Sequence, residues 1–290
     1  MREVNAMDKE QQAFERLRQG AMMSERYYDQ PLMICYSGGK DSDVLVELAF
    51  RSGINFEVVN SHTTVDAPET VRYIRQRFKE FEEKGVKCSI ELPTYKGKRT
   101  SMWELIRIKK MPPTRIVRYC CSVLKETSGD GRAVATGVRW EESVARKNGR
   151  GIFEDINANK EKRVILTNDN DDKRQLIERC QMRAKTVVNP IVDWSESEVW
   201  QYLSDCGCES NPLYQCGFDR IGCIGCPMAS NKRYMEFRRY PKYKELYIKA
   251  FDRMIAEEPS RYRWKNGQEC FEWWMGEDPN QIKLILGDEI

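Results

Sequence analysis

The segment between residues 34 and 43 carries two glycines, a lysine and several hydroxyl and carboxyl side chains. The apolar residues Leu32–Cys35 before it predict a buried strand, and the apolar residues after it recur at helical spacing. Glycines at such a junction let backbone N–H groups converge on phosphate oxygens, while Lys40 and the helix N-terminus add positive charge. The spacing differs from the Walker loop, which has four residues between its first glycine and its Gly-Lys pair. The sequence predicts a phosphate-binding loop formed by Ser37, Gly38, Gly39, Lys40, Asp41 and Ser42.

A second motif, residues 137–146, follows a predicted strand that ends near residue 136, and it contains arginines that could bind an anion. Arg139 and Arg146 are seven residues apart, or two helical turns, so both guanidinium groups could face one anion. A solvated charged helix has the same pattern, and the spacing alone leaves both alternatives open. A further segment, 62–70, follows the second predicted strand, where a doubly wound sheet places ribose and base contacts.

Predicted strands alternate with predicted helices along the first half of the chain. The strands are expected at 32–35, 56–60, 89–92 and 133–136. This alternation predicts an α/β fold with a doubly wound, mostly parallel sheet and the ligand at the carboxyl ends of the strands. We expect an N-terminal helical segment over 1–29, a nucleotide-binding domain over 30–228 with an exposed polar insertion at about 148–185, and a helical C-terminal region over 229–290.

The composition is ordinary for a globular protein, with 290 residues of which 40% are hydrophobic and 32% charged. No apolar run approaches the length of a bilayer span, and the acidic, glutamine-rich N-terminus is unlike a signal peptide. We therefore expect a cytoplasmic protein without a membrane partner. His62 is the only histidine, which nearly excludes histidine-dependent triads and His-rich zinc sites. The net charge of +3 is too small to indicate nucleic acid by itself.

Taken together and in order, these motifs resemble the phosphoadenosine-phosphosulfate reductase family of pyrophosphate-loop (PP-loop) proteins. The resemblance covers about residues 30–230. The matching segments are Ser37–Ser42, Asp66–Thr70, Gly137–Arg146, Pro190–Trp194, Pro212–Tyr214 and Gly222–Cys226.

This resemblance implies an adenine nucleotide at the strand ends, either ATP with Mg²⁺ or a sulfonucleotide (PAPS or APS). It places the phosphates at the glycine loop, the ribose near Asp66, and the anionic reacting end near Arg139 and Arg146. The nucleotide contacts that it implies in the second motif are Gly137, Arg139, Glu142 and Ser143. The residues to which it assigns catalysis are Lys40, Asp41, Arg139 and Arg146.

Eleven cysteines without a secretion signal favour metal ligation or thiol chemistry over a disulfide scaffold. Four of them form two pairs, Cys120-Cys121 and Cys223-x-x-Cys226, which is the usual ligand count for a 4Fe–4S cluster or a structural zinc. Adjacent cysteines usually point apart, so they chelate one tetrahedral ion poorly and reach separate corners of a cluster more readily. Free or redox-active thiols are a third alternative. The resemblance also implies the cluster, because the iron–sulfur reductases carry a Cys-Cys pair far upstream of Cys-x-x-Cys.

The other cysteines show no such pairing. Sulfonucleotide reductases end in a mobile tail whose cysteine, in a Glu-Cys-Gly-x-His setting, attacks sulfur. Here Cys270 stands in an aromatic stretch, and we expect it to be buried, since a nucleophilic thiol needs exposure and a lowered pKa. Three cysteines are open to interpretation as packing residues, alternative ligands or sulfur carriers: Cys206, Cys208 and Cys216. Three more are interpreted as structural: Cys35, Cys88 and Cys180.

The retained pair of Lys40 and Asp41 suits a complete ATP with magnesium, held by Asp41 or Asp43, whereas reductases that bind an already adenylated sulfate often lose this lysine. We therefore expect an ATP pyrophosphatase that adenylates an acceptor for sulfur transfer, similar to the DNA-phosphorothioation ATPase branch. Two alternatives stay open. One is a PAPS or APS reductase that uses one of the cysteines as nucleophile, and the other is a non-catalytic nucleotide or redox sensor.

The partners to consider are a sulfur-donor protein and a nucleic-acid acceptor. Two basic stretches with interleaved aromatic residues lie at 95–118 and 232–244. Phosphate neutralisation combined with aromatic stacking is a common way to hold nucleic acid. A solvated face, or a site for the phosphates of one nucleotide, has the same composition, so the sequence indicates this acceptor only weakly.

Overall fold

The computed structural model describes residues 6–126, 128–157, 163–167 and 183–276. The chain divides into two compact units, each assembled from segments that are distant in the sequence. The sheet unit comprises residues 1–62, 67–91 and 127–222, and the helical unit comprises residues 63–66, 92–126 and 223–290. The sequence predicts three consecutive stretches, 1–29, 30–228 and 229–290, and this division stays a prediction.

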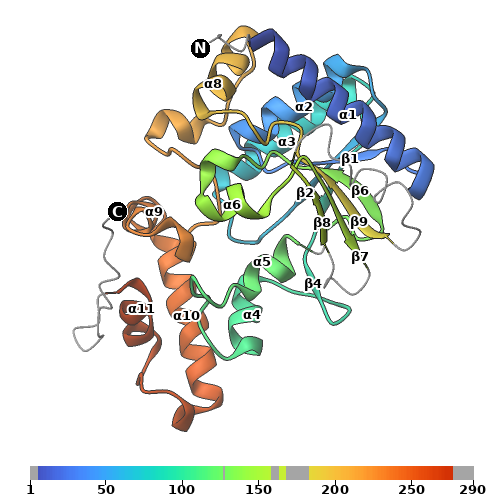
Figure 1. Ribbon diagram of the computed structural model, residues 1–290. Helices are drawn as coiled ribbons and strands as arrows, with labels where there is room; N and C mark the ends of the chain where they lie inside the picture. The colour runs from blue at the N-terminus through green and yellow to red at the C-terminus, as the bar shows by residue number, and fades with distance from the viewer. Residues whose placement is uncertain (1–5, 127, 158–162, 168–182, 277–290) are drawn as a thin grey trace. The chain divides into compact units, whose positions relative to one another are not determined.

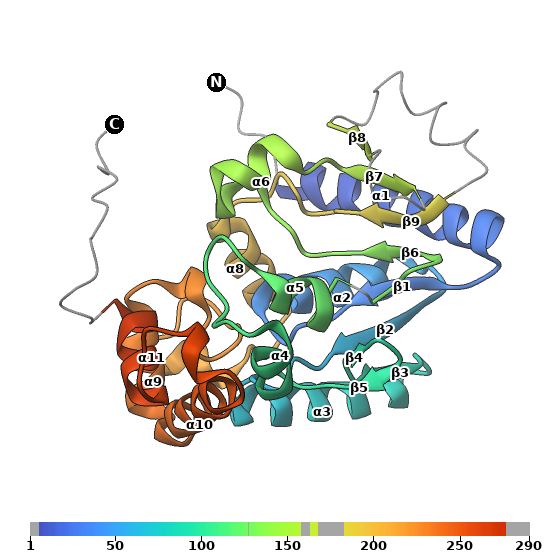
Figure 2. The same cartoon turned by 90° about the horizontal axis from the view of Figure 1, so that it is seen from below.

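The described part of the sheet unit contains a seven-stranded sheet in the order β3-β2-β1-β6-β9-β7-β8 (Figures 1 and 2). The strands are β1 Leu32–Cys35, β2 Phe56–Ser61, β3 Cys88–Glu91, β6 Arg132–Ala135, β7 Phe153–Asn157, β8 Arg163–Leu166 and β9 Arg183–Val188. Strand β1 pairs in parallel with β2 and β6, β2 with β3, and β6 with β9. The chain runs outward from β1 to β3 and then adds β6 and β9 on the other side, which confirms the doubly wound, mostly parallel sheet.

The polar stretch at 148–185 is not an exposed excursion where the structure describes it. Strand β7 pairs antiparallel with β9 and with β8, so this stretch extends the sheet. Glu154 in β7 is fully buried, and it accepts hydrogen bonds from Asn189 at 2.9 Å and Arg150 at 3.2 Å. Polar composition was a poor guide because buried polar groups are tolerated when they are hydrogen-bonded. The Asn- and Asp-rich run at 168–173 lies outside the described residues.

The described helices of the sheet unit come before β1 and after β1, β2, β6 and β9. They are α1 Ala6–Tyr28, α2 Lys40–Ser52, α3 Pro68–Glu83, α6 Val144–Gly149 and α8 Glu196–Asp205, with the 3-10 turns η1 Trp140–Glu142 and η2 Pro212–Cys216. Helix α1 packs against α2 and against strands β1, β6 and β9. Helix α8 begins at a capping box, in which Ser195 accepts a hydrogen bond from the backbone N–H of Glu198 and the Glu198 side chain accepts one in return.

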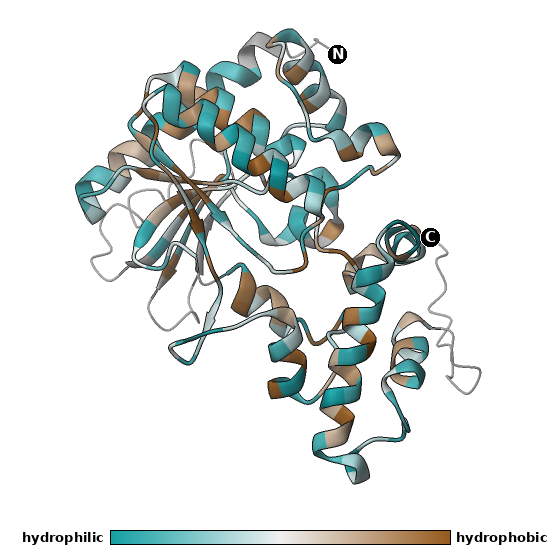
Figure 3. Cartoon of the chain, turned by 180° about the vertical axis from the view of Figure 1, so that it is seen from behind, coloured by the Kyte–Doolittle hydropathy of each residue, from teal (hydrophilic) through white to brown (hydrophobic). Residues whose placement is uncertain are grey.

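The hydrophobic core of the sheet unit lies between the sheet and its helices and holds the strands in place. Leu17 of α1, Ile34 of β1 and Leu45 of α2 are fully buried in it. Burial of each such side chain contributes about 1.5–3 kcal/mol. Figure 3 shows hydrophobic residues along the strands and hydrophilic stretches along the helices. The loops that leave the strands are therefore attached to a rigid base.

The helical unit is built around α10, Pro241–Glu257, which packs against α4, α9 and α11 (Figure 1). Its other elements are α4 Met102–Lys109, α5 Tyr119–Leu124, α9 Lys232–Arg239, α11 Gly267–Met275, the hairpin β4 Thr94–Tyr95 with β5 Lys98–Arg99, and the 3-10 turns η3 Pro227–Ala229 and η4 Pro259–Arg261. Its interior is aromatic, with the Tyr247 ring 4.7 Å from Trp274 and 5.8 Å from Phe237 between centroids. The helical C-terminal region is confirmed. None of the helices in the described ranges is long and apolar enough to cross a bilayer.

Asp43, in the first turn of α2, faces the core of the sheet unit. Its side chain is 1% exposed, and the Tyr36 hydroxyl donates a 2.5 Å hydrogen bond to it. Burial raises the pKa of Asp43 to about 7, although the hydrogen bond from Tyr36 opposes this rise. Of the two carboxylates that the sequence suggested for a metal, this burial leaves Asp41 as the candidate.

The raised pKa of Asp43 makes stability depend on pH. The protonated carboxyl is favoured in the folded state, so its contribution is complete below about pH 4 and is lost as the pH rises through about 7. We expect Asp43→Asn to remove this pH dependence, which changes the free energy of unfolding by up to about 4 kcal/mol. Urea unfolding at pH 5 and pH 8 measures it, and the variant should gain stability over the wild type as the pH rises.

The matched control is Asp205→Asn, which replaces an exposed carboxyl on α8. This variant should keep the pH dependence of the wild type. Equal pH dependence in Asp43→Asn and the wild type would contradict a buried, protonated carboxyl.

Candidate functional site

The glycine loop connects the carboxyl end of β1 to the first turn of α2. Gly38 has a φ of +70°, and a Cβ atom there would lie 2.8 Å from Ile74 Cγ1, so a larger residue does not fit. Ser42 Oγ accepts hydrogen bonds from the backbone N–H groups of Ser37 at 3.3 Å and Gly39 at 3.2 Å. These contacts close the loop over the N-terminus of α2, and phosphate binding by the loop stays a prediction.

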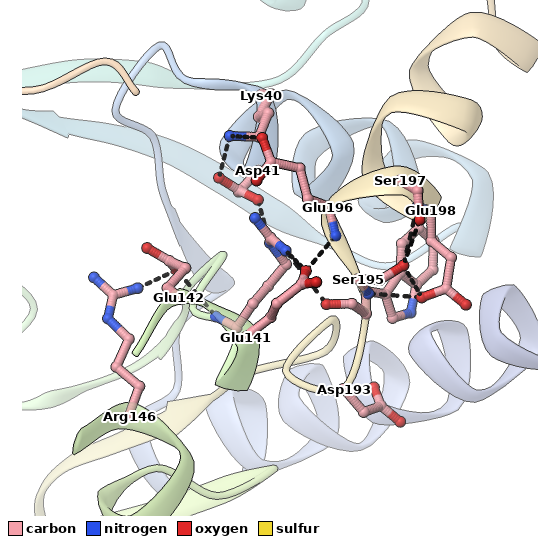
Figure 4. A network of polar contacts seen from close by, with 12 residues as sticks. Lys40, Asp41, Glu141, Glu142, Arg146, Asp193, Ser195, Glu196, Ser197 and Glu198 are labelled. Carbon is pink, nitrogen blue, oxygen red and sulfur yellow. Dashed lines mark hydrogen bonds and ion pairs between the residues drawn. The ribbon is translucent and has the colours of Figure 1, made fainter. Parts of the chain in front are cut away.

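Lys40 is only 5% exposed and lies among oxygen atoms. Its Nζ donates to the backbone carbonyl of Asp219 at 3.4 Å, and lies 3.5 Å from the Glu196 carboxylate and 3.9 Å from the Asp41 carboxylate (Figure 4). Glu196 and Asp219 were not predicted as site residues, because neither belongs to a recognisable motif. The lysine charge is thus held at the N-terminus of α2, where the helix dipole also favours an anion.

Two aromatic residues that the sequence analysis did not assign to the site also contact Lys40. The ring centroids of Trp200 and Tyr214 lie 5.8 and 5.5 Å from Nζ, within the range of cation–π attraction. The Tyr214 hydroxyl also accepts the backbone N–H of Lys40 at 2.9 Å. The Pro-Leu-Tyr segment of the resemblance was the one signal in the sequence that pointed to Tyr214.

The second motif approaches the glycine loop closely. A Cβ atom on Gly137 would lie 2.9 Å from the backbone oxygen of Asp41, so glycine is required where the two backbones meet. Arg139 is 2% exposed, with its Nε 2.6 Å from Asp41 and one Nη 2.9 Å from Glu141. Burial lowers the pKa of Arg139, but the neighbouring carboxylates, Asp41 first, outweigh burial and raise it. Arg139 therefore stays charged in a buried ion pair.

Arg146 lies on the first turn of α6, which Ser143 caps by accepting the backbone N–H of Arg146 at 3.2 Å. The guanidinium group of Arg146 forms an ion pair with Glu142 (Figure 4). Glu142 also accepts the backbone N–H of Arg139 at 3.2 Å. Burial lowers the pKa of Arg146, and Glu142 opposes this effect. Both arginines thus have carboxylate partners, and their binding of one shared anion stays a prediction.

The two motifs meet at a defined place in the sheet. Strands β1 and β6 are neighbours, and the glycine loop and the second motif follow their carboxyl ends. From this point the chain adds β2 and β3 on one side and β9 on the other, so it is the topological switch point of the sheet. Doubly wound sheets bind their ligands outside the carboxyl ends of the strands at such a point.

Asp66, which the resemblance places near the ribose, belongs to the helical unit. Its carboxylate accepts hydrogen bonds from the Thr63 backbone N–H at 2.9 Å and the Thr63 hydroxyl at 2.7 Å. Its backbone pairs with Cys223, and its carbonyl accepts the Tyr243 hydroxyl at 2.7 Å. These contacts give Asp66 a structural role in the helical unit, and its contact with ribose stays a prediction.

The four paired cysteines also lie in the helical unit. Cys120 and Cys121 lie in α5, while Cys223 and Cys226 flank a turn in which the N–H of Cys226 donates to the carbonyl of Cys223 at 3.2 Å. Gly225 in this turn has a φ of +74°. Over the described ranges, no three His, Cys, Asp or Glu residues are grouped closely enough to hold a metal ion. The structure therefore places both pairs in one unit without a closed metal site.

Cationic and hydroxyl groups lie beside these thiols. Arg118 donates to Cys121 Sγ at 3.3 Å, and Cys223 Sγ donates to the Thr63 hydroxyl at 3.5 Å. A hydrogen bond from Cys120 and then the Arg118 guanidinium lower the pKa of Cys121, against the effect of burial. Burial raises the pKa of the Cys223 thiol, and the positive charge of Lys125 opposes this rise. Four thiols with two flanking cations fit the donor set and negative charge of an iron–sulfur cluster.

The unpaired cysteines have different surroundings. Cys270 in α11 is fully buried, and burial raises the pKa of its thiol, which confirms the expected burial. Cys216 is exposed at the end of η2. Cys206 Sγ accepts a hydrogen bond from Arg51 at 3.5 Å, and burial raises the pKa of Cys208 to about 11. Cys180 lies outside the described residues.

Comparisons with known proteins extend this description. An uncharacterized protein of Methanocaldococcus jannaschii is 29% identical over 227 residues, which are 76% of this chain and 46% of that protein. The adenosine 5'-phosphosulfate reductase of Bacillus cereus strain AH187 is 25% identical over 211 residues, which are 69% of this chain and 75% of the reductase. A phosphoadenylyl-sulfate reductase from Candida auris, solved as a phosphate complex, aligns with a TM-score of 0.45 at 16% identity, over 73% of this chain and 87% of that one.

The chain spans less than half the length of the first curated relatives that it matches. A model of one protein family matches most of the chain, over residues 31–229. This range contains the glycine loop, the second motif and both cysteine pairs. The chain belongs to the phosphoadenosine phosphosulfate reductase domain family.

Proposed function

We propose that the protein is an ATP pyrophosphatase that adenylates an acceptor for sulfur transfer. The observation that supports this most directly is the buried Lys40 beside Asp41 at the N-terminus of α2. A lysine and a helix N-terminus together suit the β- and γ-phosphates of ATP. Asp41, whose side chain is 23% exposed, is the carboxylate that would hold Mg²⁺.

In the proposed reaction, an oxygen atom of the acceptor attacks the α-phosphorus of ATP. The bond from this phosphorus to the bridging oxygen breaks, and pyrophosphate leaves with the electron pair. A hydrosulfide-level sulfur nucleophile then attacks the acceptor atom that carries the adenylated oxygen and loses its proton, and AMP leaves with that oxygen and the electron pair of the broken bond. Lys40 and the loop amides would stabilise the departing pyrophosphate, while Arg139 and Arg146 would stabilise the charge at the α-phosphate.

The main alternative is a PAPS or APS reductase with Cys270 or one of Cys206, Cys208 and Cys216 as its nucleophile, and the burial of Cys270 argues against that residue in this role. A nucleophilic thiol has to be exposed and to have a lowered pKa, whereas burial raises the pKa of Cys270. A nucleotide or redox sensor without turnover would use the same binding residues, so activity measurements separate it from an enzyme.

We propose further that the two cysteine pairs of the helical unit hold a 4Fe–4S cluster. When bound, such a cluster would bind or deliver sulfur, or fix the anionic end of the substrate. Arg118 and Lys125 lie where they would balance the negative charge of its thiolate ligands. Reduced thiols and a labile cluster suit the cytoplasm, which we propose as the location.

A nucleic-acid acceptor is supported by the uneven distribution of charge. The described residues of the helical unit include twenty Lys and Arg against ten Asp and Glu, although the whole chain carries only +3. Some of these cations are neutralised locally, as Arg107 is by Glu104 and Glu257. Others are exposed on the β4–β5 hairpin around Tyr95: Lys96, Lys98 and Arg99. Exposed cations beside an aromatic ring suit a phosphate backbone with stacked bases.

Loss of the loop lysine tests the adenylating reaction. Lys40→Ala should lower pyrophosphate release from ATP by about 100-fold or more, because the leaving group loses its positive charge. Lys87→Ala, which removes an exposed lysine of the same unit, should leave the rate unchanged. Absence of pyrophosphate release with any acceptor, together with sulfite formation from adenylyl sulfate, would favour the reductase.

Iron content tests the cluster. Anaerobically purified protein should be brown and contain about four iron atoms per chain. Cys223→Ser should lose most of this iron, whereas Cys216→Ser, which replaces an exposed cysteine of the sheet unit, should keep it. A colourless protein with one zinc ion would contradict the cluster.

Salt dependence tests the nucleic-acid acceptor. Binding of labelled RNA and DNA oligonucleotides should weaken steeply between about 50 and 200 mM salt, because phosphate contacts release counterions. Replacing Lys96, Lys98 and Arg99 by Ala should weaken binding and flatten this dependence. The control removes the same charge from exposed positions of the sheet unit: Lys79, Lys84 and Lys87. If the protein binds neither nucleic acid at 50 mM salt, this acceptor is ruled out.

A further inference from the structure

The first N–H groups of a helix have no carbonyl partner within the helix, and in a phosphate-binding loop they face the ligand. In this structure one such group of α2 is already occupied, because the Lys40 N–H donates to the Tyr214 hydroxyl at 2.9 Å. A Cβ atom on Gly39 would lie 3.3 Å from the same hydroxyl oxygen. The Tyr214 oxygen therefore lies directly against the glycine loop, in the position of an anion that accepts the Lys40 N–H.

The Tyr214 hydroxyl is a neutral acceptor at this position. Burial raises the pKa of Tyr214, so the phenol keeps its proton at neutral pH. Hydrogen bonds to an ionised phosphate are shorter and stronger than those to a neutral oxygen. A phosphate oxygen that reaches the Lys40 N–H therefore replaces a weaker acceptor.

The backbone that carries Tyr214 is anchored independently of this hydroxyl. Asn211 is fully buried and donates to the carbonyl of Gly38 at 3.0 Å and to the Thr70 hydroxyl at 3.2 Å. Leu213, next to Tyr214, is 2% exposed. The Tyr214 side chain can thus turn away from the loop while the η2 backbone stays in place.

The Lys40 ammonium group is held by the same aromatic residues. The rings of Trp200 and Tyr214 are in edge contact, with centroids 4.9 Å apart, and both lie within 6 Å of Nζ. When Tyr214 turns away, Lys40 loses one ring contact and becomes available to a second phosphate oxygen. Displacement of Tyr214 therefore frees the backbone N–H and the side chain of Lys40 together.

We propose that Tyr214 is a positioning residue whose hydroxyl accepts the Lys40 N–H at a phosphate position of the loop and is displaced by the pyrophosphate group of the ligand. This inference rests on the proposed function, since it assumes a polyphosphate ligand. It also implies selectivity. ATP and pyrophosphate displace Tyr214, whereas AMP, which lacks the β- and γ-phosphates, leaves it in place.

The test is the affinity of Tyr214→Phe, which keeps the ring and removes the competing oxygen. The Kd of inorganic pyrophosphate, measured by calorimetry, should fall about three- to tenfold, because no hydrogen bond has to be given up. The Kd of AMP should not change. Tyr202→Phe is the matched control, since its hydroxyl contacts Arg51 and Glu10 rather than the loop, and both affinities should stay as in the wild type.

Weaker or unchanged pyrophosphate binding by Tyr214→Phe would overturn the inference, since it would mean that the hydroxyl is not displaced. If the wild type binds neither ATP nor pyrophosphate, the proposed function fails as well. The fluorescence of Trp200 gives a second measurement on the unmodified chain. Pyrophosphate should change an emission component that Trp200→Phe removes, and the absence of such a change would count against displacement.

Discussion

The ion pair between Arg139 and Asp41 is the interaction on which the arrangement of the glycine loop and the second motif depends. It joins the segments that follow β1 and β6, which are neighbours in the sheet but distant in the sequence. The pair can form because Gly137 lets one backbone pass against the other. Arg139 is buried and Asp41 is partly exposed, so loss of Asp41 would leave the buried arginine charge with Glu141 as its remaining carboxylate partner. The glycine loop and the second motif therefore form one connected site, in which each segment helps to position the other.

Local patterns in the sequence predicted the strand and the glycine loop. They did not predict the side chains that long-range contacts bring to the loop. The apolar run at β1 and the glycines after it are local signals, and both the strand and the loop lie where they were predicted. Tyr214 and Lys40 are 174 positions apart, and no local pattern reports that they touch. Glu196 lies beside Lys40 for the same reason, because α8 packs on α2. Sequence reasoning found the residues that lie in motifs and missed those brought in by packing.

Polar composition and net charge, which average over a segment or over the chain, were poor guides to burial and to local charge. Polar side chains can be buried when they are hydrogen-bonded to each other. The polar residues of β7 suggested an exposed stretch, but Glu154 is buried with hydrogen-bonding partners on Asn189 and Arg150. The net charge of +3 likewise concealed the basic character of the helical unit. The two cysteine pairs are about a hundred residues apart and both belong to the helical unit, which spacing alone does not show.

Three backbone N–H groups of the glycine loop, those of Ser37, Gly39 and Lys40, donate to oxygen atoms of side chains, so an anion that reaches them has to exchange with these partners. The acceptors of its N–H groups are neutral oxygens, Ser42 Oγ for Gly39 and the Tyr214 hydroxyl for Lys40. An ionised phosphate is a stronger acceptor than either, so this exchange favours binding. Arg139 differs, because its present partners are the carboxylates of Asp41 and Glu141, which carry the same charge as a phosphate. The loop is consequently the part of the candidate site where an anion would gain most, and phosphates bound there, as we propose, would determine where the rest of the ligand lies.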